Sequence, residues 1–280
     1  MNKEKTSKNK STRIDIATFA GLALALGGIV GGLLLEKGSL LDIAQYTAAL
    51  IVFGGTLGAV MVTTPLAALK AAASQIKAVF FETSHSPGTM INDIVQFATK
   101  ARKHGIVSLE MDAEAIADPF LRKAINLAVD GTDLDEMRSM MELEIDLLDH
   151  RTEEVAKVFD SAGGYSPTVG IIGAVMGLIQ VMKNLSNIEM VGHGIAVAFV
   201  ATVYGVGVAN LLLLPAAGKI RARGAKDRQH RELALDGVLG IIEGANPKLI
   251  KAKLDAYLYG EDAKPKSNDK VKKAPEAKAA

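Results

Sequence analysis

The sequence predicts an all-α polytopic membrane protein: four transmembrane helices, with a helical cytoplasmic domain between the second and the third. Four apolar stretches without a charged residue support this prediction, at 16–35, 43–63, 167–182 and 195–217. A helix needs about 20 apolar residues to cross a bilayer, and three of the stretches reach that length. No segment alternates with the two-residue period of a strand, so we expect no sheet.

Composition narrows the possible functions. Hydrophobic residues make up 49% of the 280 residues and charged residues 22%, which indicates a membrane part and a large water-exposed part. A net charge of only +1 argues against nucleic acid as a partner, and membrane lipid is expected instead. The absence of cysteine excludes disulfides, thiolate catalysis and cysteine-bound metal.

The first two spans lie within 16–63, after a cytoplasmic N-terminus at 1–15. Basic residues precede span one, as in a signal peptide, but its apolar region is too long and span two follows closely. We therefore expect a retained helix. Because cytoplasmic flanks are rich in Lys and Arg, the charge pattern places both termini inside. The cations that set this orientation are Lys3, Lys5, Lys8, Lys10, Arg13, Lys70, Lys77, Lys219, Arg221, Arg223, Lys226 and Arg228.

A cytoplasmic helical domain is predicted over 64–165. Apolar residues fall at helical spacing in Ile91–Ala98 and again in Leu121–Ala128. Asp130-Gly131 marks a turn, and Thr132 resembles a helix cap. A long helical pattern follows towards span three, and its methionines (Met137, Met140 and Met141) are predicted to be core residues.

Spans three and four lie within 166–217. Span three is short, so a buried helix of a soluble domain remains an alternative. Ser166 is predicted to cap its start with Pro167 in the first turn, whereas Pro215 is predicted to kink the end of span four. Pairs of glycines four residues apart predict close helix packing. These pairs are Gly27 with Gly31, Gly28 with Gly32, Gly54 with Gly58, and Gly173 with Gly177.

A cytoplasmic helical tail is predicted over 218–262. A helix should run to Glu243, and Gly244 and Pro247 should close it and open a short helix. The apolar side of this short helix should carry Leu249, Ile250, Leu254 and Tyr257. The rest, 263–280, is rich in Lys, Ala and Pro with hardly any large apolar residue, so we expect a disordered tail.

No constellation of catalytic residues is present, so we do not expect an enzyme. The five histidines show no metal-ligand spacing, and no phosphate-binding loop occurs, so neither a metal nor a cofactor is expected. The spans also lack the carboxylate that proton or sodium movement through lipid normally requires. Either this chain transports no ion, or a partner supplies the carboxylate.

The layout of two spans, a cytoplasmic segment and two further spans resembles the MotA/PomA family of flagellar motor stator subunits, over roughly Ile14 to Gly260. The most specific stretches are Ala162–Gly177 (AGGYSPTVGIIGAVMG), Gly194–Gly205 (GIAVAFVATVYG) and Asp236–Pro247 (DGVLGIIEGANP). The resemblance implies a channel-forming subunit of the bacterial inner membrane that converts ion flow into torque. It also implies five copies surrounding two copies of a single-span MotB-like partner, which carries the essential aspartate.

The resemblance also implies two sites. Pro167, Ala174, Thr202 and Pro215 would face the partner and the ion path. Sodium-type relatives usually carry threonine at the position of Ala174, so proton transport is expected rather than sodium.

On the cytoplasmic side, Arg102, Lys103 and Glu110 would face the rotor protein FliG. Some relatives have a second acid where this chain has Met111, and Asp112 and Glu114 are expected to compensate. An energy-transducing subunit of the ExbB/TolQ type and a non-conducting membrane scaffold remain alternatives.

Overall fold

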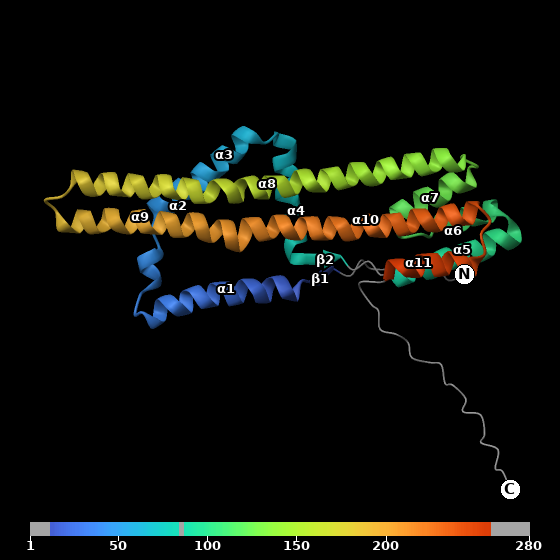
Figure 1. Cartoon of the computed structure of the whole chain (residues 1–280), viewed down its shortest axis with the longest axis horizontal. Coiled ribbons are helices and arrows are strands. Elements are labelled where there is room, and N and C mark those ends of the chain that lie inside the picture. The colour runs from blue at the N-terminus through green and yellow to red at the C-terminus, as the bar shows by residue number, and fades with distance from the viewer. Residues whose placement is uncertain (1–11, 84–86, 259–280) are drawn as a thin grey trace, which may run out of the picture. The chain divides into compact units, whose positions relative to one another are not determined.

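The computed structural model describes residues 12–83 and 87–258 (Figure 1). The described residues are helical apart from loops and one antiparallel pair of short strands, β1 (Thr12–Ile14) and β2 (Phe81–Thr83). The predicted all-α class is confirmed. The expectation of no sheet was wrong at this one place, because three-residue strands are too short to produce a visible period-two pattern.

Four helices are long and apolar enough to cross a membrane, which confirms the predicted number of spans. In order, the helices are α1 (Ile16–Leu35), α2 (Tyr46–Ala49), α3 (Gly55–Thr63), α4 (Leu66–Phe80), α5 (Pro87–His104), α6 (Glu110–Ala113), α7 (Pro119–Val129), α8 (Leu134–Lys183), α9 (Ile188–Val208), α10 (Leu214–Ile242) and α11 (Pro247–Leu254). Short 3-10 turns are η1 (Leu40–Ile43), η3 (Ile106–Leu109) and η5 (Asp255–Leu258), and π turns are η2 (Leu50–Gly54) and η4 (Ala209–Leu213).

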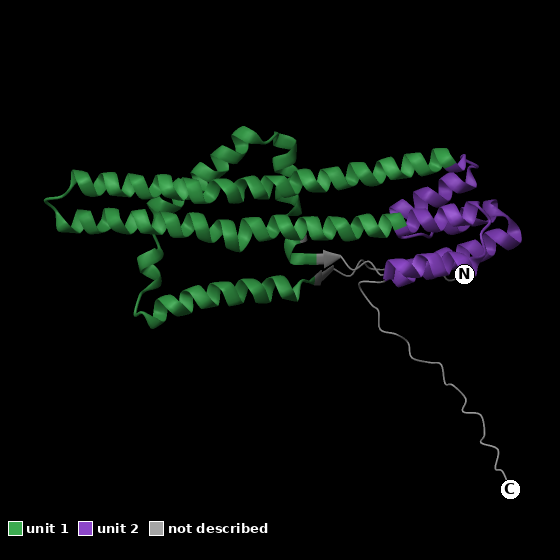
Figure 2. Cartoon of the chain, viewed as in Figure 1, with its two compact units in different colours: residues 1–85, 135–232 green, residues 86–134, 233–280 purple. Residues whose placement is uncertain are grey.

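The chain divides into two compact units, each built from separate stretches of sequence (Figure 2). Unit 1 comprises 1–85 and 135–232, and unit 2 comprises 86–134 and 233–280. The predicted cytoplasmic domain at 64–165 contributes residues to both units. Its last third, 134–165, belongs to α8, which continues without a break into span three.

In unit 1, α8 runs beside α9 with very small side chains at the contact (Figure 1). A Cβ on Gly170 would lie 2.9 Å from the carbonyl oxygen of Ala201, and one on Gly177 would lie 2.7 Å from that of Gly194. Only glycine allows backbones to approach this closely. The Gly173–Gly177 pair thus packs as predicted, whereas the pairs in spans one and two have no neighbour within 4 Å.

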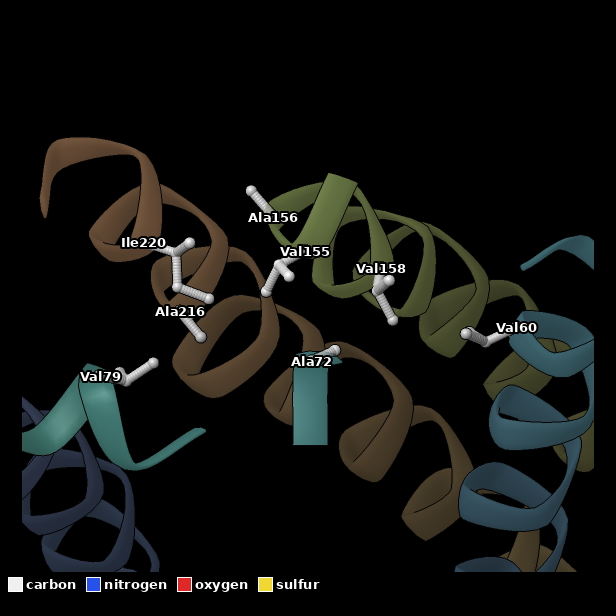
Figure 3. Close-up of a cluster of buried hydrophobic side chains, with 8 residues drawn as sticks. All are labelled: Val60, Ala72, Val79, Val155, Ala156, Val158, Ala216 and Ile220. Carbon is white, nitrogen blue, oxygen red and sulfur yellow. The ribbon is translucent and has the colours of Figure 1, made fainter. Parts of the chain in front are cut away.

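A cluster of eight buried side chains joins four helices of unit 1 (Figure 3). The members are Val60 from α3, Ala72 and Val79 from α4, Val155, Ala156 and Val158 from α8, and Ala216 and Ile220 from α10. By contrast, no residue of α1 is buried. Span one therefore leaves its apolar surface available to lipid.

Unit 2 has its own core, formed by α5, α7, α11 and the end of α10. Ile91, Ile94 and Ala98 of α5 are buried, as are the predicted apolar positions of α7. Gly237 permits a close approach, since a Cβ there would lie 2.7 Å from Ile94. The predicted apolar side of α11 is correct at Ile250 and Leu254, but Leu249 is exposed.

The turns of unit 2 follow the predicted chemistry. Gly131 and Gly244 adopt positive φ after α7 and α10, respectively. Asn246 caps α11 by accepting a hydrogen bond from the N–H of Lys248 at 3.0 Å. The disorder predicted for 263–280 concerns a segment outside the described residues.

Candidate functional site

Pro167 lies inside a helix, not at the start of one. The prediction that Ser166 caps span three was wrong, because α8 continues through both residues. Proline has no N–H, so the carbonyl of Gly163 lacks its usual donor four residues later. The Ser166 side chain is buried and donates instead to the carbonyl oxygen of Gly205 on α9, at 3.0 Å. Ser166 therefore joins span three to span four.

Pro215 occupies a second irregular point. It is the second residue of α10, and α10 directly follows the π turn η4. Helix α9, η4 and α10 form one continuous helical run from Ile188 to Ile242. A π turn shifts the hydrogen-bond register by one residue, which accommodates the missing N–H of the proline. Span four thus passes its proline without a break.

Pro167 and Thr202 come together at the close contact of α8 and α9. A Cβ on Gly205 would lie 3.3 Å from the Cα of Pro167, and one on Gly170 would lie 3.5 Å from the Cα of Thr202. Both Thr202 and Ala174 are half-buried. Pro215 lies 13 residues beyond Thr202, about 20 Å along the helix. The four predicted residues therefore form a line along the two spans, not one cluster.

The hydroxyl of Thr202 donates to the carbonyl oxygen of Ala198, at 3.3 Å. Its lone pairs still remain as acceptors. Ala174 adds only a methyl group, and neither 167–182 nor 195–217 contains a charged residue. This surface can guide an ion past neutral groups, but it cannot itself take up or release a proton.

A buried carboxylate, Asp15, stands at the flank of the spans, and the sequence analysis did not single it out. Its side chain is 8% exposed and forms ion pairs with Lys219 and Arg223 of α10, the latter at 2.8 Å. It also caps α1 by accepting from the N–H of Thr18 at 3.1 Å. The hydrogen bond from Lys219 is the main cause that holds the pKa of Asp15 well below its usual range, against the opposing effect of burial.

Arg223 also donates to the carbonyl oxygen of Phe81 in β2, at 2.7 Å. The start of span one, strand β2 and the end of span four thus meet at Asp15. Two signals in the sequence point to this site: an acid directly before an apolar run, and cations four residues apart on one helix. Only the cations were used in the sequence-based prediction, as signals of membrane orientation.

Beyond the spans, α8 and α10 are joined by ion pairs. Arg221 forms two hydrogen bonds to the carboxylate of Glu153, both at 2.8 Å, and also contacts Asp160. The paired guanidinium lowers the pKa of Glu153, and the two carboxylates raise the pKa of Arg221. About two helical turns after Arg221, Arg228 forms ion pairs with Asp146 and Asp149 of α8 and with Glu232 of its own helix. Within the spans, α8 therefore contacts α9 through small residues, and beyond the spans α8 contacts α10 through ion pairs.

The predicted rotor-facing charges lie on either side of one turn in unit 2. Arg102 and Lys103 lie in the last turn of α5, and Glu110 is the first residue of α6. All three side chains are exposed, and none has an ion pair within the described residues. Asp112 is paired with Lys100 at 2.6 Å, so its expected compensation for Met111 stays a prediction. Glu114 is exposed and unpaired within the same described part of the chain.

Tyr204 has a role that the sequence did not reveal. Its hydroxyl accepts a hydrogen bond from the N–H of Gln45 at 3.3 Å and donates to the carbonyl oxygen of Ile43. These backbone groups lie at the break between η1 and α2, where the N–H of Gln45 also donates to the carbonyl oxygen of Ile43 at 3.2 Å. Tyr204 thus satisfies the irregular start of span two from a neighbouring span.

Comparison with known proteins supplies the context for this geometry. The sequence model of the MotA/TolQ/ExbB proton channel family matches residues 112–233, and that of the motility protein A N-terminal domain matches residues 19–105. Motility protein A of Bacillus subtilis is 32% identical over 250 residues, covering 89% of this chain and 93% of that protein. This chain belongs to the motility protein A family. The resemblance stated from its motifs is confirmed.

Other relatives agree with this assignment. Chemotaxis protein PomA of Vibrio alginolyticus is 32% identical, over 88% of this chain and 96% of PomA. The solved structure of C. jejuni MotAB has a TM-score of 0.85 at 33% identity, covering 89% of this chain and 98% of that one. The flagellar MotAB stator complex from Bacillus subtilis has a TM-score of 0.80 at 32% identity, covering 86% and 95%.

These findings give the function at the level of the family. The chain is a membrane protein and a stator subunit of the flagellar motor, built on a proton channel family domain. The motility protein A N-terminal match over residues 19–105 favours this assignment over the ExbB/TolQ alternative.

Proposed function

We propose that this subunit forms the neutral wall of a proton pathway whose carboxylate comes from a single-span MotB-like partner. The observation that carries the proposal is the complete lack of charge in 167–182 and 195–217, in a chain of a proton channel family. The similar solved structures are those of MotAB from C. jejuni and Bacillus subtilis, which supports a MotB-like partner here.

The proposed wall consists of Pro167, Ala174, Thr202 and Pro215. Protonation of the partner's aspartate removes a charge and changes its contacts with this neutral surface. The ring of subunits then steps around the partner. A proton that crosses a membrane potential supplies about 2.3 kcal/mol per 100 mV, which can drive such steps.

Proton transport is proposed over sodium transport because of Ala174. A methyl group offers no lone pair to a dehydrated sodium ion, whereas the hydroxyl of Thr202, which donates to Ala198, keeps its lone pairs and does not distinguish the two ions. Swimming should therefore continue when sodium is replaced by potassium, and should stop when a protonophore collapses the proton gradient. A swimming speed that changes with the sodium concentration at a constant proton gradient would contradict this assignment.

The assembly we propose is five copies around two copies of the partner, in the bacterial inner membrane with both termini in the cytoplasm. Many large apolar side chains of α8 and α9 are exposed in the single chain, which supports contacts with other subunits and with the partner. In this arrangement, Arg102, Lys103 and Glu110 contact the rotor protein FliG.

The central test is proton flux in vesicles that contain the subunit with its partner. Flux should require the partner and should be lost when the partner's aspartate is changed to asparagine. The subunit alone should be silent, because its spans contain no group that titrates as a carboxylate does. Proton flux through vesicles of the subunit alone would overturn the proposed division of roles.

A further inference from the structure

The turn between α5 and α6, here called the α5–α6 turn (residues 102–114), is held in one conformation. The first residue after α5 is Gly105, whose positive φ of 79° favours glycine. The N–H of Gly105 donates to the carbonyl oxygen of Ala101 at 2.8 Å. The hydroxyl of Ser108 donates to the carbonyl oxygen of Gly105 at 2.6 Å. The backbone polar groups at the start of the turn are therefore satisfied locally.

The inner side of the α5–α6 turn is fixed to the rest of unit 2. Leu109 and Ala113 are buried, and the ion pair from Lys100 to Asp112 joins α6 to α5. A surface on such a support loses little conformational freedom when it binds. The outer side of the turn is thus preorganised.

Two apolar side chains project from the outer side. Val107 is 63% exposed and Met111 is 85% exposed. Val107 lies in the 3-10 turn η3, and Met111 lies in α6, which follows η3 directly, so the two residues are about one helical turn apart. Single exposed apolar residues are common on protein surfaces, so exposure alone is not informative.

The charges around this pair make it informative. Arg102 and Lys103 precede Val107 in the sequence. Glu110 lies between Val107 and Met111, and Glu114 follows Met111. All four are exposed and have no ion pair within residues 12–83 and 87–258. Unpaired charges around an apolar pair match the anatomy of protein interfaces, in which an apolar centre is surrounded by a polar rim. A lipid surface is a poor occupant, since both acids would face anionic headgroups.

We propose that Val107 and Met111 form the apolar centre of the rotor contact, with Arg102, Lys103, Glu110 and Glu114 as its rim. The proposal rests on the rotor contact proposed above. It specifies the partner's surface, namely an apolar depression bordered by acidic groups towards Arg102 and basic groups towards Glu114. Methionine is unbranched and polarizable, so it can fit a depression that it enters and leaves repeatedly.

The centre and the rim should respond differently to salt. Rim charges are exposed, so added salt screens them and weakens what they contribute. Burial of Val107 and Met111 is driven by removal of apolar surface from water, which moderate salt does not weaken. Binding should therefore keep a salt-resistant part that depends on these two side chains.

The test is binding of the purified rotor protein to the complete stator complex in lipid nanodiscs, at low and at high salt. Met111→Ser and Val107→Ser should each weaken binding about tenfold at both salt concentrations. Met111→Leu should retain most of the affinity. Leu249→Ser is the matched control, because Leu249 is 64% exposed in the same unit but outside the turn. Arg102→Ala and Glu110→Ala should weaken binding at low salt and little at high salt.

The outcomes separate this inference from the proposed function. If the charge variants weaken binding while Met111→Ser and Val107→Ser match Leu249→Ser, the apolar centre is refuted and the rotor contact stands. If none of the variants changes binding, the rotor contact at this turn fails, and the inference with it. Circular dichroism and nanodisc assembly equal to wild type would show that the serine variants fold.

Discussion

At the scale of single residues, Asp15 shows how a carboxylate is retained at a membrane flank. Burial alone would favour its neutral form, but Lys219 and Arg223 reverse that preference and lower its pKa. A carboxyl group with a depressed folded-state pKa stabilises the folded protein above its unfolded-state pKa of about 4. That contribution is lost as the pH falls through the folded-state value.

Asp15→Asn should therefore destabilise the protein at neutral pH, by about 3 kcal/mol, since it leaves two cations at a mostly buried site without their anion. The difference from wild type should shrink below about pH 4, where the carboxyl group of the unfolded wild-type chain begins to be protonated while that of the folded protein stays ionised. Thermal unfolding in detergent, followed from about pH 3 to about pH 7, measures both effects. Glu36→Gln, an exposed acid at the other end of α1, should change little; equal losses in both variants would count against the ion-pair explanation.

Gly205 offers a second prediction at this scale. A Cβ there would lie 2.6 Å from the carbonyl oxygen of Ser166, so Gly205→Ala must push α8 and α9 apart. We expect a loss of about 2 kcal/mol and weaker swimming. Gly207 lies two residues further along the same helix and has no neighbour within 4 Å, so Gly207→Ala should be tolerated. Unfolding and motility assays on both variants would detect a difference, and its absence would refute the close-contact argument.

At the scale of elements, Pro167 interrupts the hydrogen bonds of α8 without ending the helix. Pro167→Ala restores the missing donor, so the subunit should assemble normally and be at least as stable. Swimming should nevertheless be lost, because the proposed stepping needs a deformable point in span three. Pro119→Ala, at the first turn of α7, is the control. Normal swimming of Pro167→Ala would refute the hinge role.

Sequence patterns predicted some elements well and others poorly, for physical reasons. The spans, α5 and α7 follow from local hydrophobic spacing, and Gly131 and Gly244 from local turn chemistry. The continuity of α8 could not be predicted, since proline is common in first helical turns and rare inside helices. Whether Ser166 caps a helix or bonds to Gly205 depends on a tertiary contact.

The site residues show the same division. Thr202 and Pro167 could be predicted only by resemblance, and their closeness depends on how α8 packs on α9. Asp15 was missed because its partners lie more than 200 residues away, as in its hydrogen bond to Arg223. The pairing of Asp112 with Lys100 likewise required the fold.

At the scale of the whole molecule, unit 2 depends on two distant stretches of sequence. Truncation after Glu232 removes Gly237, Ile250 and Leu254 from the core around Ile94. We expect α5 and α7 to become sensitive to limited proteolysis while the spans stay in the membrane. Truncation after Leu258 keeps every described residue and should leave the protection intact. Equal protection in both truncated chains would show that 86–134 folds independently.

The 50 residues of α8 form one helix about 75 Å long, which includes span three in its C-terminal part. Ion pairs from Arg221 and Arg228 brace it against α10 where the spans end. The braced part of α8, which precedes Pro167, should have little torsional compliance of its own. A turn that starts at Pro167 should reach the opposite end of α8 with little lag, so elastic storage between successive steps would reside at the proline or in other parts of the motor.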